Sequence, residues 1–432
     1  MADSKRIAIM GGTLIDGTGT APRSNPGLYI EGNTIRKVGT LNEDESRDWS
    51  TAQVVDASGQ YIMPGLIDAH CHMSLHQGSL PGVKFPSSAE FCTLWAGRNA
   101  TQVLHAGVTG ISVPGGKWFA DVAVRDSING GLLKGPRMFV AGRGLTPYGG
   151  IFDQTSAWSP AMGDTSGPTA SAGVICNTID EFVTEVRRQS KYGVDMIKVA
   201  DSYWGDIQTV SQAELRAVVE EAHRRNLKVS IHARGSGSTR DSAKAGVDWI
   251  FHADWATDED LDAVAEGGMP IVPAFTSPAI AVKFGGEMGF SEKMRDRLKR
   301  QLDINYRAIQ KARDRGIRIL AGTDSGNVAA YGHGRWHGLE LEIFVKEIGM
   351  SPMEAIMAAT SLNAVTIGLE GKTGAIRDGM LADIIIWDGD PVADISILHK
   401  PEHLTLVMKD GGIVDRTTEG YLPLKNEPPR AH

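Results

Sequence analysis

The feature that most constrains the fold of this chain is a repeated alternation of amphipathic helical segments with short apolar runs. The apolar runs span residues 61–72, 108–116, 137–144, 194–201, 227–234, 247–254, 269–276 and 317–324. Continuous apolar strands linked by helices are typical of a parallel sheet covered by helices. Eight such units predict closure into a (β/α)8 barrel of the TIM type. An open, doubly wound sheet is the alternative, but no GxGxxG motif follows an early strand.

Two helix starts can be located within this alternation. Thr178 or Asp180 is expected to begin the helix in "IDEFVTEVRRQSKYG", and Ser211 with Glu214 has the spacing of a capping box. In a capping box the two side chains satisfy backbone N–H groups that the first helical turn leaves unpaired. These positions therefore predict where two of the barrel helices begin.

Both ends of the chain have a different pattern, with short alternating strands and tight turns. The segments "RIAIMGGTLIDGTG" and "GLYIEGNTIRKVG" lie near the N-terminus, and "GAIRDGMLADIIIWDGD" and "LTLVMKDGGIV" lie near the C-terminus. Neither end alone has enough strands for a stable sheet. We therefore predict that residues 1–64 and 371–432 pair into one small β domain, with the barrel inserted as residues 65–370.

Charge and cysteine content exclude several classes of protein. The net charge of -8 argues against a nucleic-acid partner, which needs a basic face. The three cysteines form no CxxC pair, so we expect neither a disulfide framework nor a cysteine zinc site. No apolar run is long enough for a membrane span. The N-terminal residues lack the apolar core of a signal peptide. We expect a cytoplasmic protein, or a secreted or periplasmic one if a signal peptide has been removed.

Residues that can bind metals occur at the ends of five predicted strands. They are His70 and His72 in "IDAHCH", Lys198 in "MIKV", His232 in "SIHA", His252 in "IFHAD" and Asp324 in "AGTDSG". The carboxyl ends of barrel strands meet at one rim, where active sites lie. His70 and His72 are two residues apart and point the same way, whereas Cys71 points to the opposite face. A lone histidine at a strand end is more often structural, but that interpretation must account for six positions independently.

Four imidazoles and a carboxylate that converge on one point suit Zn²⁺ or a similar divalent ion. An ammonium at Lys198 does not, because it has no lone pair and is itself positive. Carbamylation by CO₂ would turn Lys198 into N6-carboxylysine, an anion whose two oxygens can bridge two ions. We therefore predict two divalent ions, expected to be Zn²⁺, with His70 and His72 on one, His232 and His252 on the other, and the lysine carbamate between them. A mononuclear site with Lys198 as a spectator is the alternative.

Asp324 has two roles in this hypothesis. It can ligate one ion and accept a proton from the nucleophilic water, whose pKa two cations bring close to neutrality. It can then pass that proton to the leaving nitrogen. The predicted reaction is metal-assisted hydrolysis without a covalent intermediate.

Together these strand ends resemble the amidohydrolase superfamily. The segments "MPGLIDAHCH", "MIKV", "SIHA", "IFHAD" and "AGTDSG" carry the resemblance, and the tail from "GMSPMEAIMAATSLNAVTIGLEG" to "ADIIIWDGDP" is similar to the last helices and closing β domain of that family. The resemblance covers nearly the whole chain. It implies a binuclear metal centre with a carboxylated lysine, hydrolysis of an amide, ester or similar bond, and a β sandwich built from both termini.

Within the superfamily the chain is most similar to the imidazolonepropionase-related branch that includes prolidases and ochratoxin-hydrolysing amidohydrolases. This resemblance implies hydrolysis of an amide bond to a C-terminal amino acid, in an N-acyl amino acid or a dipeptide. The specific reaction it suggests is cleavage of ochratoxin A to ochratoxin alpha and phenylalanine. The alternatives are an Xaa-Pro dipeptidase, a cyclic-amide hydrolase or deaminase, and a scaffold without catalysis.

Candidate substrate-binding residues lie in the segments that follow the strands with predicted metal ligands. Similar enzymes hold the free carboxylate of the substrate with an arginine at the position of Arg240, and Arg234 stands where several of them have tyrosine. The planar guanidinium binds a carboxylate bidentately, and we favour Arg240 over Arg234. Tyr203 can line the substrate pocket, and His337 can lie near the substrate. The expected partners are a small carboxylate-bearing substrate and further copies of this chain, for which the resemblance suggests a homo-oligomer such as an octamer.

Overall fold

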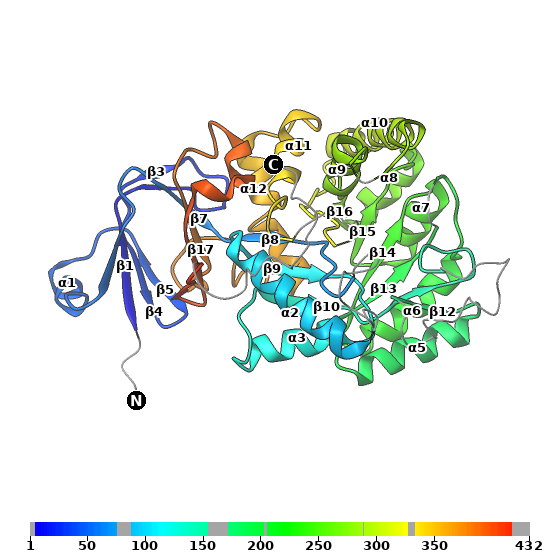
Figure 1. Ribbon diagram of the computed structural model, residues 1–432, viewed down its shortest axis with the longest axis horizontal. Coiled ribbons are helices and arrows are strands. Elements are labelled where there is room, and N and C mark those ends of the chain that lie inside the picture. The colour runs from blue at the N-terminus through cyan, green and yellow to red at the C-terminus, as the bar shows by residue number, and fades with distance from the viewer. Residues whose placement is uncertain are drawn as a thin grey trace.

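The protein is described from a computed structural model, in which residues 5–75, 88–153, 172–202, 205–287, 289–326 and 333–416 are placed. Figure 1 shows two bodies, a β sandwich on the left and a helix-covered barrel on the right. Across these ranges, no helix combines the length and the apolar character that a membrane crossing needs.

The barrel strands are parallel, as the apolar runs predict. They are β8 (Leu66–Asp68), β9 (Val108–Val113), β10 (Arg137–Val140) continued by β11 (Gly144–Thr146) as the third strand, β13 (Met196–Ala200), β14 (Lys228–Ala233), β15 (Trp249–His252) and β16 (Ile271–Val272). One sheet has the order β10-β9-β8, and another has the order β12-β11-β13-β14-β15-β16, with β12 at Gly173–Ile175. Asp195, just before β13, donates its backbone N–H to Val140 of β10 over 2.8 Å. The first sheet is thereby joined to the second.

The eighth predicted strand closes the ring as a bridging segment rather than as a regular strand. Its backbone accepts and donates hydrogen bonds on both sides between residues 318 and 325. Leu320 donates to Ile271 on the β16 side over 2.9 Å, and Ala321 accepts from Ala69 on the β8 side over 2.9 Å. The fold is therefore the (β/α)8 barrel that the sequence predicts.

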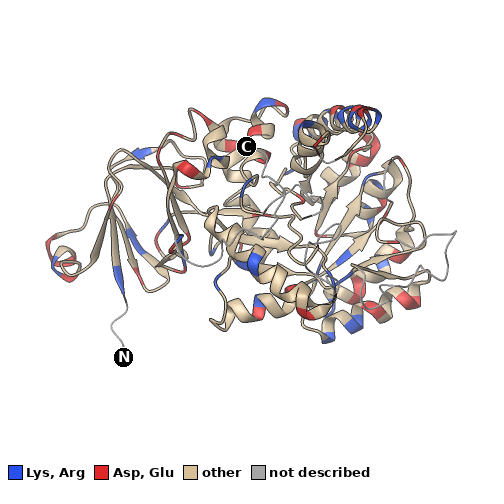
Figure 2. Ribbon diagram, viewed as in Figure 1, with Lys and Arg blue, Asp and Glu red and all other residues tan. Residues whose placement is uncertain are grey.

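Helices cover the outside of the barrel. They are α2 (Ala89–His105), α3 (Ala120–Asn129), α5 (Ile179–Lys191), α6 (Gln212–His223), α7 (Ser236–Ala245), α8 (Asp258–Gly267), α9 (Thr276–Phe284), α10 (Glu292–Asp314), α11 (Leu339–Lys346) and α12 (Pro352–Ala358). Thr178 caps α5, and Ser211 forms a capping box with Glu214 at the start of α6. Charged residues gather on these outer helices, most densely on α10, whereas the strands are mostly uncharged (Figure 2).

The sandwich combines strands from both ends of the chain. One sheet contains β1 (Arg6–Met10), β4 (Leu28–Glu31), β5 (Thr34–Val38) and β6 (Gln53–Asp56). The other has the order β19-β18-β17-β7-β2-β3, with β2 (Thr13–Leu14), β3 (Arg23–Ser24), β7 (Tyr61–Pro64), β17 (Ile384–Trp387), β18 (Leu404–Lys409) and β19 (Gly412–Ile413).

The pairing of β7 with β17 joins the N-terminal and C-terminal parts of the chain in one sheet, as predicted from the sequence. The two strands are antiparallel, with Ile385 opposite Met63. Residues of both sheets bury one apolar core, in which Ile7, Ile30, Ile62 and Ile384 are fully buried. Neither end could bury this surface alone. The boundaries at residues 64 and 370 stay a prediction.

Short elements complete the chain between and around these bodies. They are α1 (Glu43–Asp48) and three 3₁₀ helices, η1 (Leu362–Ile367), η2 (Ile395–His399) and η3 (Pro401–His403). The segment η1 packs under the barrel against β8, β9 and β10. It contributes Asn363, whose side-chain amide donates to the carbonyls of Ile67 and Ala321, each over 2.7 Å. The strand β8 and the eighth barrel segment, residues 318–325, are thus joined through Asn363 as well.

Candidate metal centre

The barrel brings the six predicted ligands to one rim. Parallel register sets Ala200 of β13 opposite His232 of β14, and Ala233 of β14 opposite His252 of β15. All six side chains are buried, and they come from β8 or the residues just after it, β13, β14, β15 and the eighth segment. They are His70, His72, Lys198, His232, His252 and Asp324. The strand-end pattern in the sequence therefore becomes a cluster in space.

Asp324 lies between the two histidines of "HCH". Its Oδ1 is 3.1 Å from Nε2 of His72 and 3.3 Å from Nε2 of His70. The ring centroids of His70 and His252 are 5.4 Å apart, and those of His252 and His232 are 4.5 Å apart. Ligand atoms of His70, His252 and Asp324 all lie within 4.8 Å of one another, a spacing that one metal ion can span.

Two backbone conformations at this rim are unusual for residues with a side chain. His252 has φ = 76° and Asp324 has φ = 57°. The left-handed region is costly for such residues, and strain of this kind concentrates at functional sites. The backbone thus aims both side chains at the cluster against its local preference.

Lys198 is buried in this cluster, where the charge of Asp324 favours its protonated form and that of Arg234 opposes it. Its Nζ lies 3.7 Å from the centre of the Phe251 ring, which in turn lies 4.1 Å from the His70 ring. Burial is the main cause that lowers the pKa of Lys198 well below its usual value. A neutral amine has the lone pair that a reaction with CO₂ requires, so the environment suits the predicted carbamate.

Several buried nitrogen atoms of the cluster have no hydrogen-bond partner within the described ranges. They are His70 Nδ1, Lys198 Nζ, His232 Nε2 and His252 Nε2. Buried polar atoms are normally satisfied. Burial also lowers the pKa of His70, His232 and His252 well below the usual value, which keeps these imidazoles in the neutral form that binds metal. The donor set therefore fits divalent ions.

His72 is oriented by a second contact. Its Nδ1 lies 2.7 Å from the carbonyl oxygen of Gly115, so Nδ1 is the donor and Nε2 is left facing Asp324. Metal-ligating histidines commonly donate their other ring N–H in this way. The contact comes from the loop after β9, which the sequence did not single out.

The two candidate arginines differ in position. Arg234 is buried at the end of β14, where it pairs with Asp254, and Gln301 also donates to Asp254 over 2.8 Å. Arg240 is on α7, with its side chain 32% exposed, and its guanidinium lies 3.4 Å from Glu259 of α8. Only Arg234 lies next to the ligand cluster, because it follows His232 by two residues on the same strand. Tyr203 lies outside the described residues.

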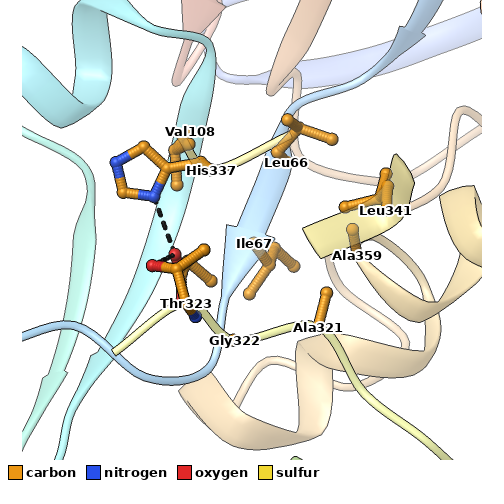
Figure 3. Close-up of a pocket in the computed structure, with 10 residues that line it drawn as sticks. Leu66, Ile67, Val108, Ala321, Gly322, Thr323, His337, Leu341 and Ala359 are labelled. Atoms are coloured by element: carbon orange, nitrogen blue, oxygen red, sulfur yellow. Dashed lines mark hydrogen bonds and ion pairs between the residues drawn. The ribbon is translucent and has the colours of Figure 1, made fainter. Parts of the chain in front are cut away.

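His337 was predicted to lie near the substrate, but both of its ring nitrogens are already engaged. Its Nδ1 is 2.7 Å from Oδ2 of Asp68, and its Nε2 accepts from the backbone N–H of Gly334 over 3.2 Å. Burial opposes ionisation of Asp68, but the hydrogen bonds from His337 and Thr323 hold its pKa below the usual value. Figure 3 shows His337 beside Thr323 and the apolar side chains of Leu66 and Val108.

Asp68 and Asp254 were not predicted from the sequence, although a signal for Asp68 was present. Asp68 precedes His70 by two residues, and Asp254 follows His252 by two residues. Alternate residues of a strand share a face, so Asp68 was a predictable neighbour of the ligand cluster. Asp254 was not, because β15 ends at His252 and the backbone of His252 and Ala253 is left-handed. Their partners, Thr323, His337 and Arg234, come from other segments and required the tertiary structure.

Two characterised enzymes and one further relative are similar to this chain. Ochratoxinase of Aspergillus niger is 27% identical over 441 residues, covering 95% of this chain and 86% of that protein, and its crystal structure matches with a TM-score of 0.80. The structure of an Xaa-Pro dipeptidase with bound methionine matches with a TM-score of 0.83 and 29% identity, covering 95% of this chain and 100% of that one. Imidazolonepropionase of Haloarcula marismortui is 24% identical and covers 96% of each chain.

The family assignment rests on a match over most of the sequence. The model of the amidohydrolase family matches residues 61–414, which include the barrel and the strands β17 and β18. All six strand-end residues of the cluster fall inside this match. The resemblance noted in the sequence is therefore confirmed, and the chain belongs to the amidohydrolase family of hydrolases.

Proposed function

We propose that this protein is a metal-dependent amidase that releases a C-terminal amino acid from an N-acyl amino acid or a dipeptide. Two observations carry the proposal: the buried nitrogens of Lys198, His232 and His252 have no hydrogen-bond partner among the described residues, and Nε2 of His70 and of His72 lie within 3.3 Å of Asp324 in the same cluster. Such a cluster is costly unless a ligand satisfies it. Neutral imidazoles and carboxylates are typical protein ligands of divalent metal ions such as Zn²⁺.

The proposed centre holds two ions, which we expect to be Zn²⁺. His70 and His72 would hold one ion, and His232 and His252 the other. Lys198 would bridge them after its neutral Nζ forms an N–C bond to CO₂ and releases one proton to solvent, giving N6-carboxylysine. When bound, such ions supply Lewis acidity and lower the pKa of water near neutrality.

Asp324 is the proposed proton carrier. Its Oδ1 lies within 3.3 Å of two imidazole nitrogens, so it faces the point where a water would be activated. As a carboxylate it can accept a proton from that water and then donate it to the nitrogen of the departing amino acid. The water hydroxyl forms a bond to the acyl carbon, the amide C–N bond breaks, and the proton held by Asp324 passes to the departing nitrogen.

The proposed substrate has a free carboxylate close to the scissile amide. Arg234 supports this, because its guanidinium is held at the end of β14 beside the cluster. Arg240 is the second candidate, on the first turns of α7. The specific substrate we propose is ochratoxin A, cleaved to ochratoxin alpha and phenylalanine, since the A. niger relative is an ochratoxinase. Xaa-Pro dipeptides are the alternative, which the similarity to an Xaa-Pro dipeptidase favours. We also propose a homo-oligomer.

Two measurements on the purified protein test the proposal. Elemental analysis of protein made with metals supplied should find about two divalent ions per chain, and a reproducible zero would exclude the metal centre. A hydrolysis screen should include N-acyl amino acids, Xaa-Pro dipeptides and ochratoxin A, with Asp324→Asn prepared in parallel as the inactive control. Hydrolysis confined to cyclic amides, or deamination instead of hydrolysis, would overturn the substrate class.

A further inference from the structure

The carboxylate of Asp68 connects the two segments that carry His70 and Asp324. Its Oδ1 accepts the backbone N–H of His70 over 2.9 Å and that of Thr323 over 3.0 Å. Its Oδ2 accepts the Thr323 hydroxyl over 2.6 Å and His337 Nδ1 over 2.7 Å. His70 is itself a proposed ligand, Thr323 directly precedes the ligand Asp324, and the fourth donor is His337. The carboxylate of Asp68 therefore links the end of β8 to the eighth barrel segment.

His337 has a single tautomer in this arrangement. A carboxylate only accepts hydrogen bonds, so Nδ1 of His337 carries the proton that points to Asp68. Its Nε2 accepts from Gly334 and therefore carries a lone pair. Both contacts fix the ring in place and hold Oδ2 of Asp68, which leaves Oδ1 directed between His70 and Thr323.

A second histidine, His333, joins the segment that contains His337 to the backbone just after β8. Nε2 of His333 lies 3.1 Å from the backbone carbonyl oxygen of His72 and donates to it. His333 and His337 are both buried. The segment after the eighth strand is thus tied to the backbone of "DAHCH" through two imidazoles.

The surroundings of the Asp68–His337 pair are apolar and small. The pocket beside it is lined by Leu66, Ile67, Val108 and Leu341 together with Thr323 (Figure 3). Its polar side chains, Asp68, Thr323 and His337, are hydrogen-bonded to one another rather than directed at an amino-acid carboxylate. His337 therefore lies in the packing beneath the rim.

We propose that Asp68 and His337 are a positioning pair that sets the separation of His70 from Asp324. The inference rests on the proposed function and replaces the substrate-binding role expected for His337. A displaced Asp68 carboxylate would let the backbones of His70 and Thr323 separate, which moves Asp324 relative to the imidazoles. Groups that orient metal ligands typically contribute about 10- to 100-fold in metal affinity or activity.

The test compares three variants of the metal-loaded protein. His337→Leu should lower kcat about 10- to 100-fold with little change in KM, and should speed metal release into a chelator by a similar factor. His337→Asn should restore both quantities in large part, because its amide nitrogen can donate from near the position of Nδ1. His399→Leu is the matched control: it removes a 2.6 Å contact between an imidazole and Glu342 and should change neither quantity.

A purely structural role would give a different result. If His337→Leu lowers Tm while kcat and the metal release rate stay as in the wild type, the positioning role is overturned. If His337→Leu does not fold, the nearly isosteric Thr323→Val removes another hydrogen bond to Asp68. It should likewise lower kcat and speed metal release, and wild-type values of both would overturn the inference. A wild type that holds metal but hydrolyses nothing in the screen contradicts the proposed function alone, because the metal release rates still decide this inference.

Discussion

Two layers of polar side chains at the barrel rim differ in how their atoms are satisfied. In the upper layer, nitrogens of His70, Lys198, His232 and His252 have no hydrogen-bond partner in the part of the chain that the structure describes. In the layer below, the carboxylate of Asp68 receives four donors. Both layers are buried. The upper layer has atoms left to bind a ligand, whereas the hydrogen bonds of the lower layer keep the surrounding backbone in position.

The difference follows from the cost of burial. A buried polar atom without a partner costs about 1–3 kcal/mol, so a folded chain retains several together only where another group satisfies them. Proteins violate local rules of this kind chiefly at functional sites. The satisfied layer supplies the rigidity that keeps the unsatisfied one in place.

The largest effect is expected for Asp324 in the upper layer. Asp324→Asn removes the proposed proton acceptor and one anionic ligand, and kcat should fall by about 10²- to 10⁴-fold. Steady-state kinetics on the substrate found in the screen measure this loss. Asp303→Asn, on the exposed face of α10, is the control and should keep wild-type turnover. A kcat within threefold of the wild type for Asp324→Asn would remove it from the chemistry.

Lys198 tests whether the upper layer needs the carbamate. Lys198→Ala should lose about 100-fold or more in activity and part of its metal, because the bridge between the ions is gone. Short carboxylic acids added to the assay should restore some activity by taking the place of the carbamate oxygens. Elemental analysis and kinetics together decide the matter. Unchanged turnover with a full metal complement would show that Lys198 is a spectator beside a mononuclear site.

The two arginines sharpen the comparison, since only one of them belongs to the buried rim. Arg234→Lys keeps the charge opposite Asp254 but loses the planar fork, and should raise KM about tenfold or more for a substrate with a free carboxylate. The methyl ester or amide of the same substrate should be affected much less. Arg240→Lys, on α7, should change KM for both forms little. The reverse ranking would return the carboxylate-binding role to Arg240.

The smallest effect is expected at a satisfied carboxylate remote from the rim. Glu221 on α6 accepts from Arg187, Arg224 and Arg225 over about 2.9 Å, and the hydrogen bonds from Arg187 and Arg225 lower its pKa to about 2. Its contribution to stability is present above the unfolded pKa near 4.5 and is lost as the pH falls towards 2. Glu221→Gln should lower Tm at pH 7 by no more than about 2 °C.

Thermal unfolding of wild type and Glu221→Gln between pH 7 and pH 2 would measure that contribution. The two melting temperatures should converge as the pH falls, while activity at pH 7 stays equal. A growing difference at low pH would contradict the lowered pKa, and a loss of activity would contradict the remote position of Glu221.

Much of the barrel and of the candidate site could be predicted from local patterns. The eight apolar runs predicted eight barrel strands, and the residues at their ends predicted which side chains would meet, because parallel strands bring their carboxyl ends to one rim. The helix starts at Thr178 and Ser211 followed from capping chemistry. The spacing of His70 and His72 predicted that they point away from Cys71, which is buried and accepts a hydrogen bond from the Ser325 hydroxyl.

Other features could not be predicted because they depend on contacts between distant segments. The substrate-binding role of Arg240 stays a prediction from the spacing in similar sequences, and only the tertiary structure showed that its guanidinium lies 3.4 Å from Glu259 of α8. His337 was assigned by its place after the eighth strand, whereas its role depends on Asp68, a residue 269 positions away. The left-handed backbone of His252 and Asp324 opposes local preference and gives no signal in composition.

The sequence by itself determined the family, the barrel and the set of residues that line its rim, since strand periodicity and strand order follow from local patterns of apolar residues. Only the tertiary structure decided which polar atoms of that rim are satisfied and which are left for a ligand. The physical reason is that a hydrogen bond depends on distances of about 3 Å and on direction. Those quantities exist only after the strands have packed, when Asp68 meets Thr323 and His337 while His232 and His252 meet no donor or acceptor at Nε2 among the described residues.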